Sequence, residues 1–295
     1  MTLVAHALVG PDEVWGAWPF DPLVMLGLVT AALVYALGSI RLRRAGRRSL
    51  RRAAAFWAGT VALGVALLSP LDAVAETLLS VHMAQHLLLI VVAAPLLVVA
   101  RPVATWFMAF PSGSRRTAAR ARAAIAFVPR VLRRPLVAFG VVTVAMWSWH
   151  APTLYEAALV NEPVHALEHG SFLVASMLAW SVALRGRRRD VSNAFGRALF
   201  LVAFALQGAL LGAVLVFAST PLYPVHRGGP ELWGLTALQD QQLAGVLMWI
   251  PPTAVYLAAI AAVLFGAFRT MELRAEGADV NLRADGLDVG SARVK

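Results

Sequence analysis

Long stretches of mostly apolar residues divide the chain into seven windows, and each window is long enough to cross a lipid bilayer as a helix. A helix needs about 20 such residues to span about 30 Å of hydrocarbon. The windows lie at 22–40, 53–70, 78–100, 135–151, 164–184, 198–218 and 242–266. Apolar residues make up 59% of the chain and the mean hydropathy is +0.70, values too high for a soluble domain. The pattern therefore predicts an integral membrane protein.

The fold class expected from these windows is all-α, a polytopic bundle of seven transmembrane helices. The windows lack the alternation of apolar and polar residues that marks the strands of a membrane barrel, and helices satisfy their own backbone hydrogen bonds in hydrocarbon. We expect an outer N-terminal segment at 1–21, the transmembrane domain at 22–268 and a disordered cytoplasmic tail at 269–295. The apolar run at 1–10 is short and has no Lys or Arg, so we do not expect a cleaved signal peptide.

Positive charge predicts how the chain is oriented. Of its 26 Lys and Arg residues, 25 fall in four segments, at 41–52, 101–134, 185–197 and 269–295. Short loops rich in these residues stay in the cytoplasm, so we expect three inner loops, an inner C-terminal tail and an outer N-terminus. The net charge of +10 then reflects topology and contact with anionic membrane lipid. The arginines are not interleaved with aromatic residues as on a nucleic-acid-binding surface, and we expect no nucleic-acid partner.

Four of the seven histidines form two pairs at the predicted outer ends of two helices. His82 and His86 lie four residues apart in the third window, and His165 and His169 repeat this spacing in the fifth. At about 100° per residue, the two members of a pair face one side of their helix. His150 ends the fourth window at the same predicted depth. Ionisable groups in a membrane usually face the bundle interior, so we expect these five histidines to form one or two metal sites.

The ligand types favour copper without excluding other metals. The chain has no cysteine, which excludes thiolate sites and iron–sulfur clusters. Imidazole suits copper, zinc and iron, whereas thioethers favour Cu⁺. Of the nearby Met83, Met146 and Met248, we expect at most one to be a ligand, with Met83 as the candidate. Glu168 and Asp240 are expected to complete the site or to orient its histidines.

Other uses of these residues remain as alternatives. The run at 165–169 matches HxxEH, a zinc-protease pattern in which the Glu activates water, although so short a match arises often by chance. A haem protein would use histidines as axial ligands, but these pairs lie near the surface. A copper or small-solute transporter would need a polar path to the inner side, where the windows offer little beyond Ser176 and Gln207. The histidines of a scaffold would serve only as hydrogen-bonding groups.

Five separated blocks of the sequence carry a resemblance to a known family. They are HMAQHLLL at 82–89, HAPTLYEAAL at 150–159, HALEH at 165–169, PLYP at 221–224 and DQQLAGVLMWIP at 240–251. Together, and in this order, they resemble the CtaG family of bacterial cytochrome c oxidase assembly proteins. The family motif positions on this chain are His82, His86, His150, His165, Glu168, His169 and Asp240. An unrelated single-span copper chaperone shares the family's name but relies on cysteines, which this chain lacks.

The resemblance implies a non-catalytic role in maturing a haem–copper oxidase, a step of respiratory-chain biogenesis. It further implies that copper is bound or delivered at the outer membrane face. The partners would be oxidase subunits, an outer-compartment copper chaperone and the surrounding membrane lipid. The expected location is the bacterial plasma membrane, with several membrane passes and no enzymatic activity.

Overall fold

The computed structural model describes residues 8–46, 49–111, 113–114, 131–132, 134–184, 192–226 and 228–291. The side chains of Ser192 and of residues 277–291 are not described. Within the described ranges every regular element is a helix, which confirms the all-α class for this part of the chain. Much of the two predicted inner loops at 101–134 and 185–197 lies outside the described residues.

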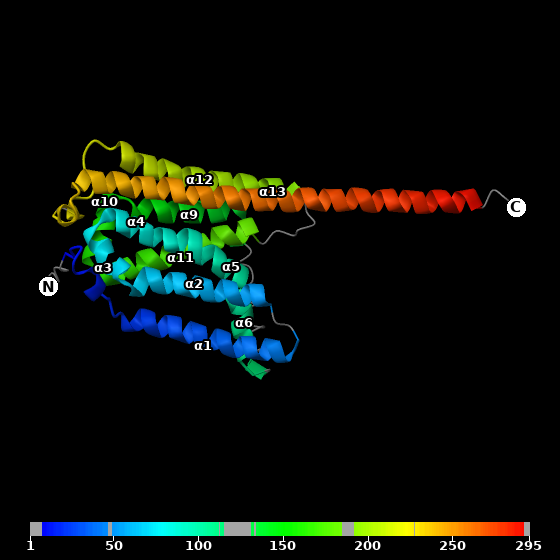
Figure 1. Cartoon of the computed structure of the whole chain (residues 1–295), viewed down its shortest axis with the longest axis horizontal. Helices are drawn as coiled ribbons and strands as arrows, with labels where there is room; N and C mark the ends of the chain where they lie inside the picture. The colour runs from blue at the N-terminus through cyan, green and yellow to red at the C-terminus, as the bar shows by residue number, and fades with distance from the viewer. Residues whose placement is uncertain are drawn as a thin grey trace.

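The helices pack side by side as an elongated bundle, from which the end of the last helix projects (Figure 1). In chain order they are η1 Val14–Gly16, α1 Pro22–Arg44, α2 Leu50–Leu68, α3 Pro70–Thr77, α4 Leu79–Leu87, η2 Leu88–Ala93, α5 Ala94–Ala100, α6 Pro102–Ala109, α9 Pro135–Trp149, α10 Pro152–Val160, α11 Glu162–Leu184, α12 Ser192–Phe217, η3 Pro224–His226, η4 Pro230–Trp233 and α13 Ala237–Ser291. The elements α4, η2 and α5 follow one another without a gap and form one span.

Six helical stretches of the described chain are long and apolar enough to cross a membrane. They are Pro22–Arg44, Leu50–Leu68, Leu79–Ala100, Glu162–Leu184, Asn193–Phe217 and Ala237–Glu276. The fourth predicted window forms the shorter apolar helix α9, whose 15 residues cover about 22 Å at about 1.5 Å per residue. The helices point to a multi-pass membrane protein, while the total of seven spans and their direction remain predictions.

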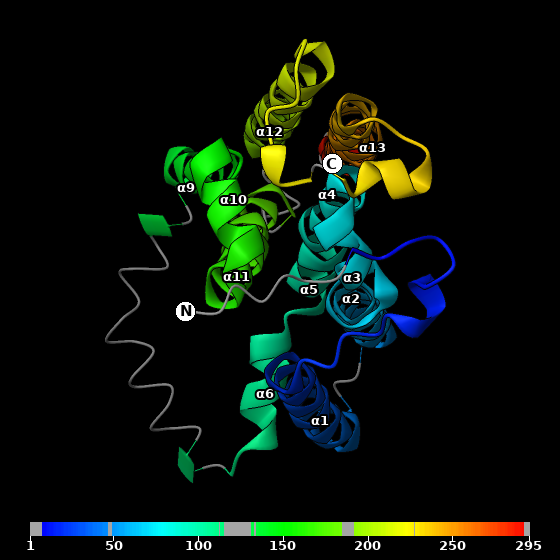
Figure 2. The same cartoon turned by 90° about the vertical axis from the view of Figure 1, so that its left-hand side faces the viewer.

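The span formed by α4, η2 and α5 lies at the centre of the bundle. In the view along the helices, this span lies between α11 and α2, with α13 beside α4 (Figure 2). Its apolar window is 61% buried, the highest share of the six, whereas the window of α1 is 11% buried. The central span can therefore bring its side chains against partners from several other helices.

The central span changes helical pitch halfway along, where Leu88–Ala93 form a π-helical segment. In a π-helix the amide of residue 95 donates to the carbonyl of residue 90, but Pro95 has no N–H. The indole Nε1 of Trp180 on α11 donates to the Ile90 carbonyl instead, at 2.9 Å. Because a carbonyl without a donor is costly in hydrocarbon, this bond supports the irregular middle of the span and ties it to α11.

Two glycines allow close contact between α12 and α13. A Cβ atom at Gly212 would lie 2.7 Å from the Gly245 carbonyl oxygen, and a Cβ atom at Gly245 would lie 2.6 Å from the Gly212 carbonyl oxygen. Small residues are what permits helices to approach this closely in a membrane. Since α13 also packs against α4, this contact helps to set where the first turn of α13 meets the central span.

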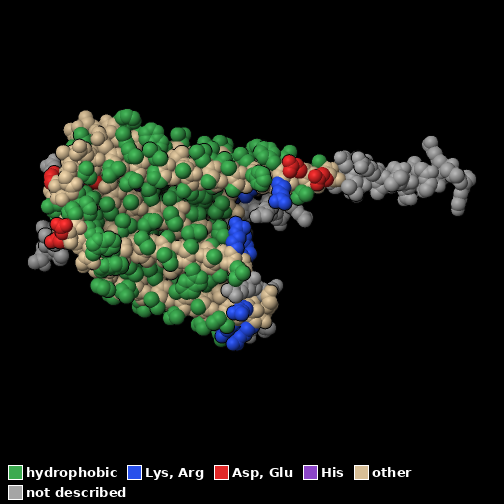
Figure 3. Space-filling model, in the orientation of Figure 1, with side chains coloured by type: hydrophobic (Ala, Val, Ile, Leu, Met, Phe, Trp, Pro, Cys, Tyr) green, Lys and Arg blue, Asp and Glu red, His purple; other side chains and the backbone are tan. Residues whose placement is uncertain are grey.

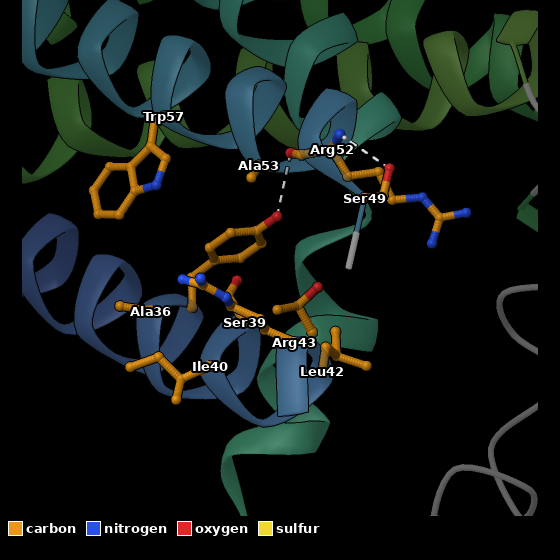
Figure 4. Close-up of a pocket in the computed structure, with 11 residues that line it drawn as sticks. Ala36, Ser39, Ile40, Leu42, Arg43, Ser49, Arg52, Ala53 and Trp57 are labelled. Carbon is orange, nitrogen blue, oxygen red and sulfur yellow. Dashed lines mark hydrogen bonds between the residues drawn. The ribbon is translucent and has the colours of Figure 1, made fainter. Parts of the chain in front are cut away.

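Charged side chains separate along the long axis of the bundle (Figure 3). Arginines gather at one end, and acidic side chains lie at the opposite end and on the projecting part of α13. At the basic end, α1, α2 and α6 surround a pocket of about 210 Å³ whose lining includes Arg43 and Arg52 (Figure 4). The Tyr35 hydroxyl donates to the Arg52 carbonyl there, at 3.2 Å. The predicted orientation places the Lys- and Arg-rich loops on the inner side of the membrane, and this end of the bundle has the charge expected there.

The last helix, α13, continues to Ser291 and extends well beyond the bundle (Figure 1). Among the residues of α13 whose side chains are described, Ala267 is the last in the hydrophobic core. The sequence predicts a disordered tail from residue 269, and in the structure this segment is helical as far as Ser291. The predicted domain boundaries remain predictions.

Replacing Trp180 with Phe tests the role of the indole in the central span. The variant keeps an aromatic ring but leaves the Ile90 carbonyl without a donor, so we expect the free energy of unfolding to fall by about 1–3 kcal/mol. Thermal unfolding of the purified protein in detergent, followed by circular dichroism, measures this change. The control is Trp57→Phe, at a side chain that is 46% exposed, where little change is expected. Equal unfolding temperatures for the two variants would contradict the role of the bond.

Candidate metal centre

Two neighbouring helices bring the predicted histidine pairs together. The nine-residue helix α4 carries His82 and His86, and α11 carries His165 and His169 near its start. The ring centroids of His82 and His165 are 5.3 Å apart, and those of His86 and His169 are 5.2 Å apart. Because residues four apart share a helix face, each helix turns both imidazoles toward the other helix.

The carboxylate of Glu168 lies between the two histidines of α4. Its Oε2 atom is 3.7 Å from His82 Nε2, and its Oε1 atom is 3.7 Å from His86 Nε2. These separations are too long for hydrogen bonds. They leave the carboxylate facing two imidazole nitrogens without a direct bond to either.

Four side chains form a group with the donor atoms of a metal site. One ligand atom from each of His82, His165, Glu168 and His169 lies within 4.8 Å of the other three. Four ligands about 2.1 Å from one tetrahedral ion lie about 3.4 Å apart, so movements of about 1 Å would close the group around an ion. We call these four residues the His/Glu group.

Several buried polar atoms here have no hydrogen-bond partner among the described residues. They are both carboxylate oxygens of Glu168, both ring nitrogens of His86 and the Nε2 atoms of His82 and His169. Glu168 and His82 are fully buried. Buried polar atoms nearly always have partners, and an uncompensated buried carboxylate is costly. A bound cation would supply the missing partner, so this donor set fits a metal ion.

His150 lies beside this group and follows the end of α9. Its Nδ1 atom is 2.7 Å from the Met146 carbonyl oxygen, and a protonated Nδ1 donates there. Its Nε2 atom is buried with no hydrogen-bond partner among the described residues, and its ring centroid is 6.3 Å from that of His86. The Tyr223 hydroxyl donates to the His150 carbonyl at 2.8 Å. The structure thus places His150 next to His86 and outside the His/Glu group.

Met83 is fully buried and also lies outside the His/Glu group. It lines a small cavity deeper in the bundle, together with Met146, Met248, His86 and His150. All three methionines that the sequence offers as candidates therefore meet at one place, although they come from three different helices.

Asp240 holds the start of α4 from the neighbouring helix α13. Its Oδ2 atom accepts from the Leu79 amide at 2.7 Å, and its Oδ1 atom accepts from the Ser80 amide at 3.1 Å and from the Ser80 hydroxyl. The first amides of a helix have no partner within the helix, and a carboxylate there also suits the helix dipole. Both oxygens of Asp240 are thereby engaged, and the structure does not bring them into the His/Glu group.

A buried network that the histidine spacing does not reveal packs against the centre. The Tyr155 hydroxyl donates to His226 Nε2 at 2.7 Å, and His226 Nδ1 is 3.3 Å from the Thr77 carbonyl. Burial lowers the pKa of His226 to about 4, so its ring is neutral, with Nδ1 as donor and Nε2 as acceptor. The Tyr155 ring lies 5.1 Å from the His82 ring. The only sequence signal for Tyr155 was its place in the block HAPTLYEAAL.

A cleft of about 450 Å³ reaches the centre from the side of α1, α3 and α10. His165 and His169 line it, and so do the carboxylate-bearing residues Asp21, Asp72, Glu76 and Glu162. Clefts lined by one sign of charge raise the local concentration of oppositely charged ions. The cleft therefore gives cations a route to the two histidines of α11.

The fold and this centre define a multi-pass membrane protein with a buried His/Glu group that could bind a metal ion. The chain belongs to the family of the cytochrome c oxidase caa3 assembly factor (Caa3_CtaG), whose model matches residues 33–270. This match confirms the resemblance carried by the five sequence blocks. The family implies an association with cytochrome c oxidase and a non-catalytic role. No curated protein and no solved structure matches the chain.

Replacing Asp240 with Ala tests whether this carboxylate holds α4 in place. The change removes the acceptors of two buried amides, and loss of such a cap costs about 0.5–2 kcal/mol, so we expect a lower unfolding temperature. Asp240→Asn keeps one oxygen acceptor and should have a smaller effect. Asp21→Ala removes a similar cap from the exposed start of α1 and serves as the control. A variant Asp240→Ala as stable as the wild type would contradict the role.

Proposed function

We propose that this protein helps to mature a haem–copper cytochrome c oxidase by holding copper in the His/Glu group and passing it to an oxidase subunit. The copper ion is cargo in this proposal, and the protein performs no chemical conversion on it. The sequence-based orientation puts the centre at the outer membrane face, where an outer-compartment chaperone would supply the ion.

The observation that carries the proposal is the set of buried donor atoms without hydrogen-bond partners. His82, His169 and Glu168 contribute such atoms from two helices, within the spacing that one ion can bridge after small movements. Three imidazoles and one carboxylate suit divalent copper and also zinc. The family's link to an oxidase that contains copper favours copper as the cargo.

Charge explains why a carboxylate belongs in this group. Transfer of a bare cation from water to an apolar interior is very costly unless an opposite charge accompanies it. Glu168 provides that charge between His82 and His86. Its position between two histidines of α4 also favours a role in holding the ion over the water-activating role of a protease glutamate.

The distribution of polar residues favours holding an ion over transporting it through the bundle. Toward the basic end, the buried polar residues of the described spans are few and scattered, with Ser176 and Gln207 as examples. A conducted ion needs successive polar groups or water along its path. The acidic cleft instead opens beside the His/Glu group, so loading and release at the same side fit the structure better.

Metal analysis of the purified protein tests the ligand set. Copper-loaded wild type should retain stoichiometric copper after desalting, and Glu168→Gln should lose most of it because the compensating charge is removed. The matched control is Glu156→Gln on the neighbouring α10, outside both the His/Glu group and the cleft. If Glu168→Gln retains as much copper as Glu156→Gln, the His/Glu group is not the copper site.

The same variants test the cellular role. In cells that lack the native protein, wild type and Glu156→Gln should restore a copper-loaded, active oxidase, and Glu168→Gln should not. Oxidase copper content and oxygen consumption of isolated membranes provide the two measurements. Full restoration of both by Glu168→Gln would contradict copper delivery through this group.

A further inference from the structure

A second group of potential ligands lies next to the His/Glu group and has a different chemical character. Met83 of α4, Met146 of α9 and Met248 of α13 line one cavity of about 20 Å³ together with His86 and His150. The three methionines are between 0% and 6% exposed. A cavity of this volume has room for about one water-sized particle, so a single ion fits without a separation of the helices.

Ordinary packing explains one buried methionine better than it explains this arrangement. Methionine is a common filler of irregular core gaps, and each of the three could serve that purpose alone. His86 and His150, however, also line this cavity, and both ring nitrogens of His86 and the Nε2 atom of His150 have no hydrogen-bond partner among the described residues. A dry apolar cavity would not require two imidazoles, whose unpaired nitrogens are costly to bury.

The lining indicates which ion would bind there. Thioethers are soft ligands that favour Cu⁺, and neutral imidazole accepts the same ion. None of the described residues that line the cavity carries a carboxylate. Without a compensating negative charge, a monovalent cation is less costly to bury than a divalent one.

We propose that Met83, Met146 and Met248, with His150, form a site selective for Cu⁺ that is distinct from the His/Glu group. His86 lies between the two groups, because its Nε2 atom faces Glu168 at 3.7 Å and its ring lines the methionine cavity. A Cu⁺ ion could move between the two groups by exchanging ligands at this single imidazole, with no change in its oxidation state. The inference takes copper as cargo from the proposed function, but Cu⁺ binding by the thioethers can be measured independently of it.

Competition with the chromophoric chelator bicinchoninate, under reducing conditions, measures Cu⁺ binding by the full-length protein in detergent. The double variant Met83→Leu/Met248→Leu conserves core volume and removes two thioethers. We expect its Cu⁺ affinity to fall by at least about tenfold. Mutation of a residue that only hydrogen-bonds to a metal ligand already lowers metal affinity by about 10- to 100-fold. The control is Met177→Leu on α11, a partly buried methionine outside the cavity. An unchanged affinity in the double variant would overturn the proposal.

X-ray absorption of the Cu⁺-loaded wild type gives a second test that does not depend on a variant's folding. Sulfur scatterers in the first coordination shell are expected, and their absence would overturn the proposal. Glu168→Gln separates the two hypotheses because it should retain Cu⁺ at the thioethers while it loses divalent copper. Loss of Cu⁺ in Glu168→Gln, with none in the double methionine variant, would support the His/Glu group alone. Loss of Cu⁺ in the double methionine variant alone, with divalent copper fully retained by Glu168→Gln, would support the thioether site and contradict the His/Glu group.

Discussion

The position of the candidate metal centre depends on the contact between the Asp240 carboxylate and the first amides of α4. Leu79 and Ser80, the first residues of α4, are 2% and 3% exposed, so the helix begins inside the bundle and its first N–H groups are shielded from bulk water. Asp240 satisfies two of them from α13. This contact fixes where α4 starts, and therefore the height at which His82 and His86 face α11. One carboxylate thus connects the packing of α12 and α13 to the geometry of the site.

The apolar windows predicted the long helices well, because the thickness of a bilayer imposes a length that composition reveals. The window at 78–100 corresponds closely to the span Leu79–Ala100, and that at 164–184 to the helix Glu162–Leu184. The short helices α3 and α10 near the site were not predicted as elements of their own. They begin at Pro70 and Pro152. A proline indicates where a helix begins, but it does not predict the direction in which that helix runs.

Residue spacing predicted which side chains share a helix face, but it carries no information on which faces meet. The i, i+4 pairs correctly put both imidazoles of each helix on one side. That α4 and α11 face each other, or that three methionines from three helices surround one cavity, depends on packing across the bundle. Asp240 shows the same limit, since its place in a motif cannot distinguish a metal ligand from the cap of a neighbouring helix.

The π-helical segment Leu88–Ala93 has a consequence for the angular phase of the central span. A π turn holds about one residue more than an α turn, and one residue corresponds to about 100° of rotation. The two halves of the span are therefore out of phase. A helical wheel drawn for the whole stretch as one α-helix would place the side chains of one half on the wrong face. With this offset, His82 and His86 face α11, while Ala93 and Leu97 in the other half pack in the core formed with α2. The offset lets one continuous span serve a polar centre at one end and an apolar helix interface at the other.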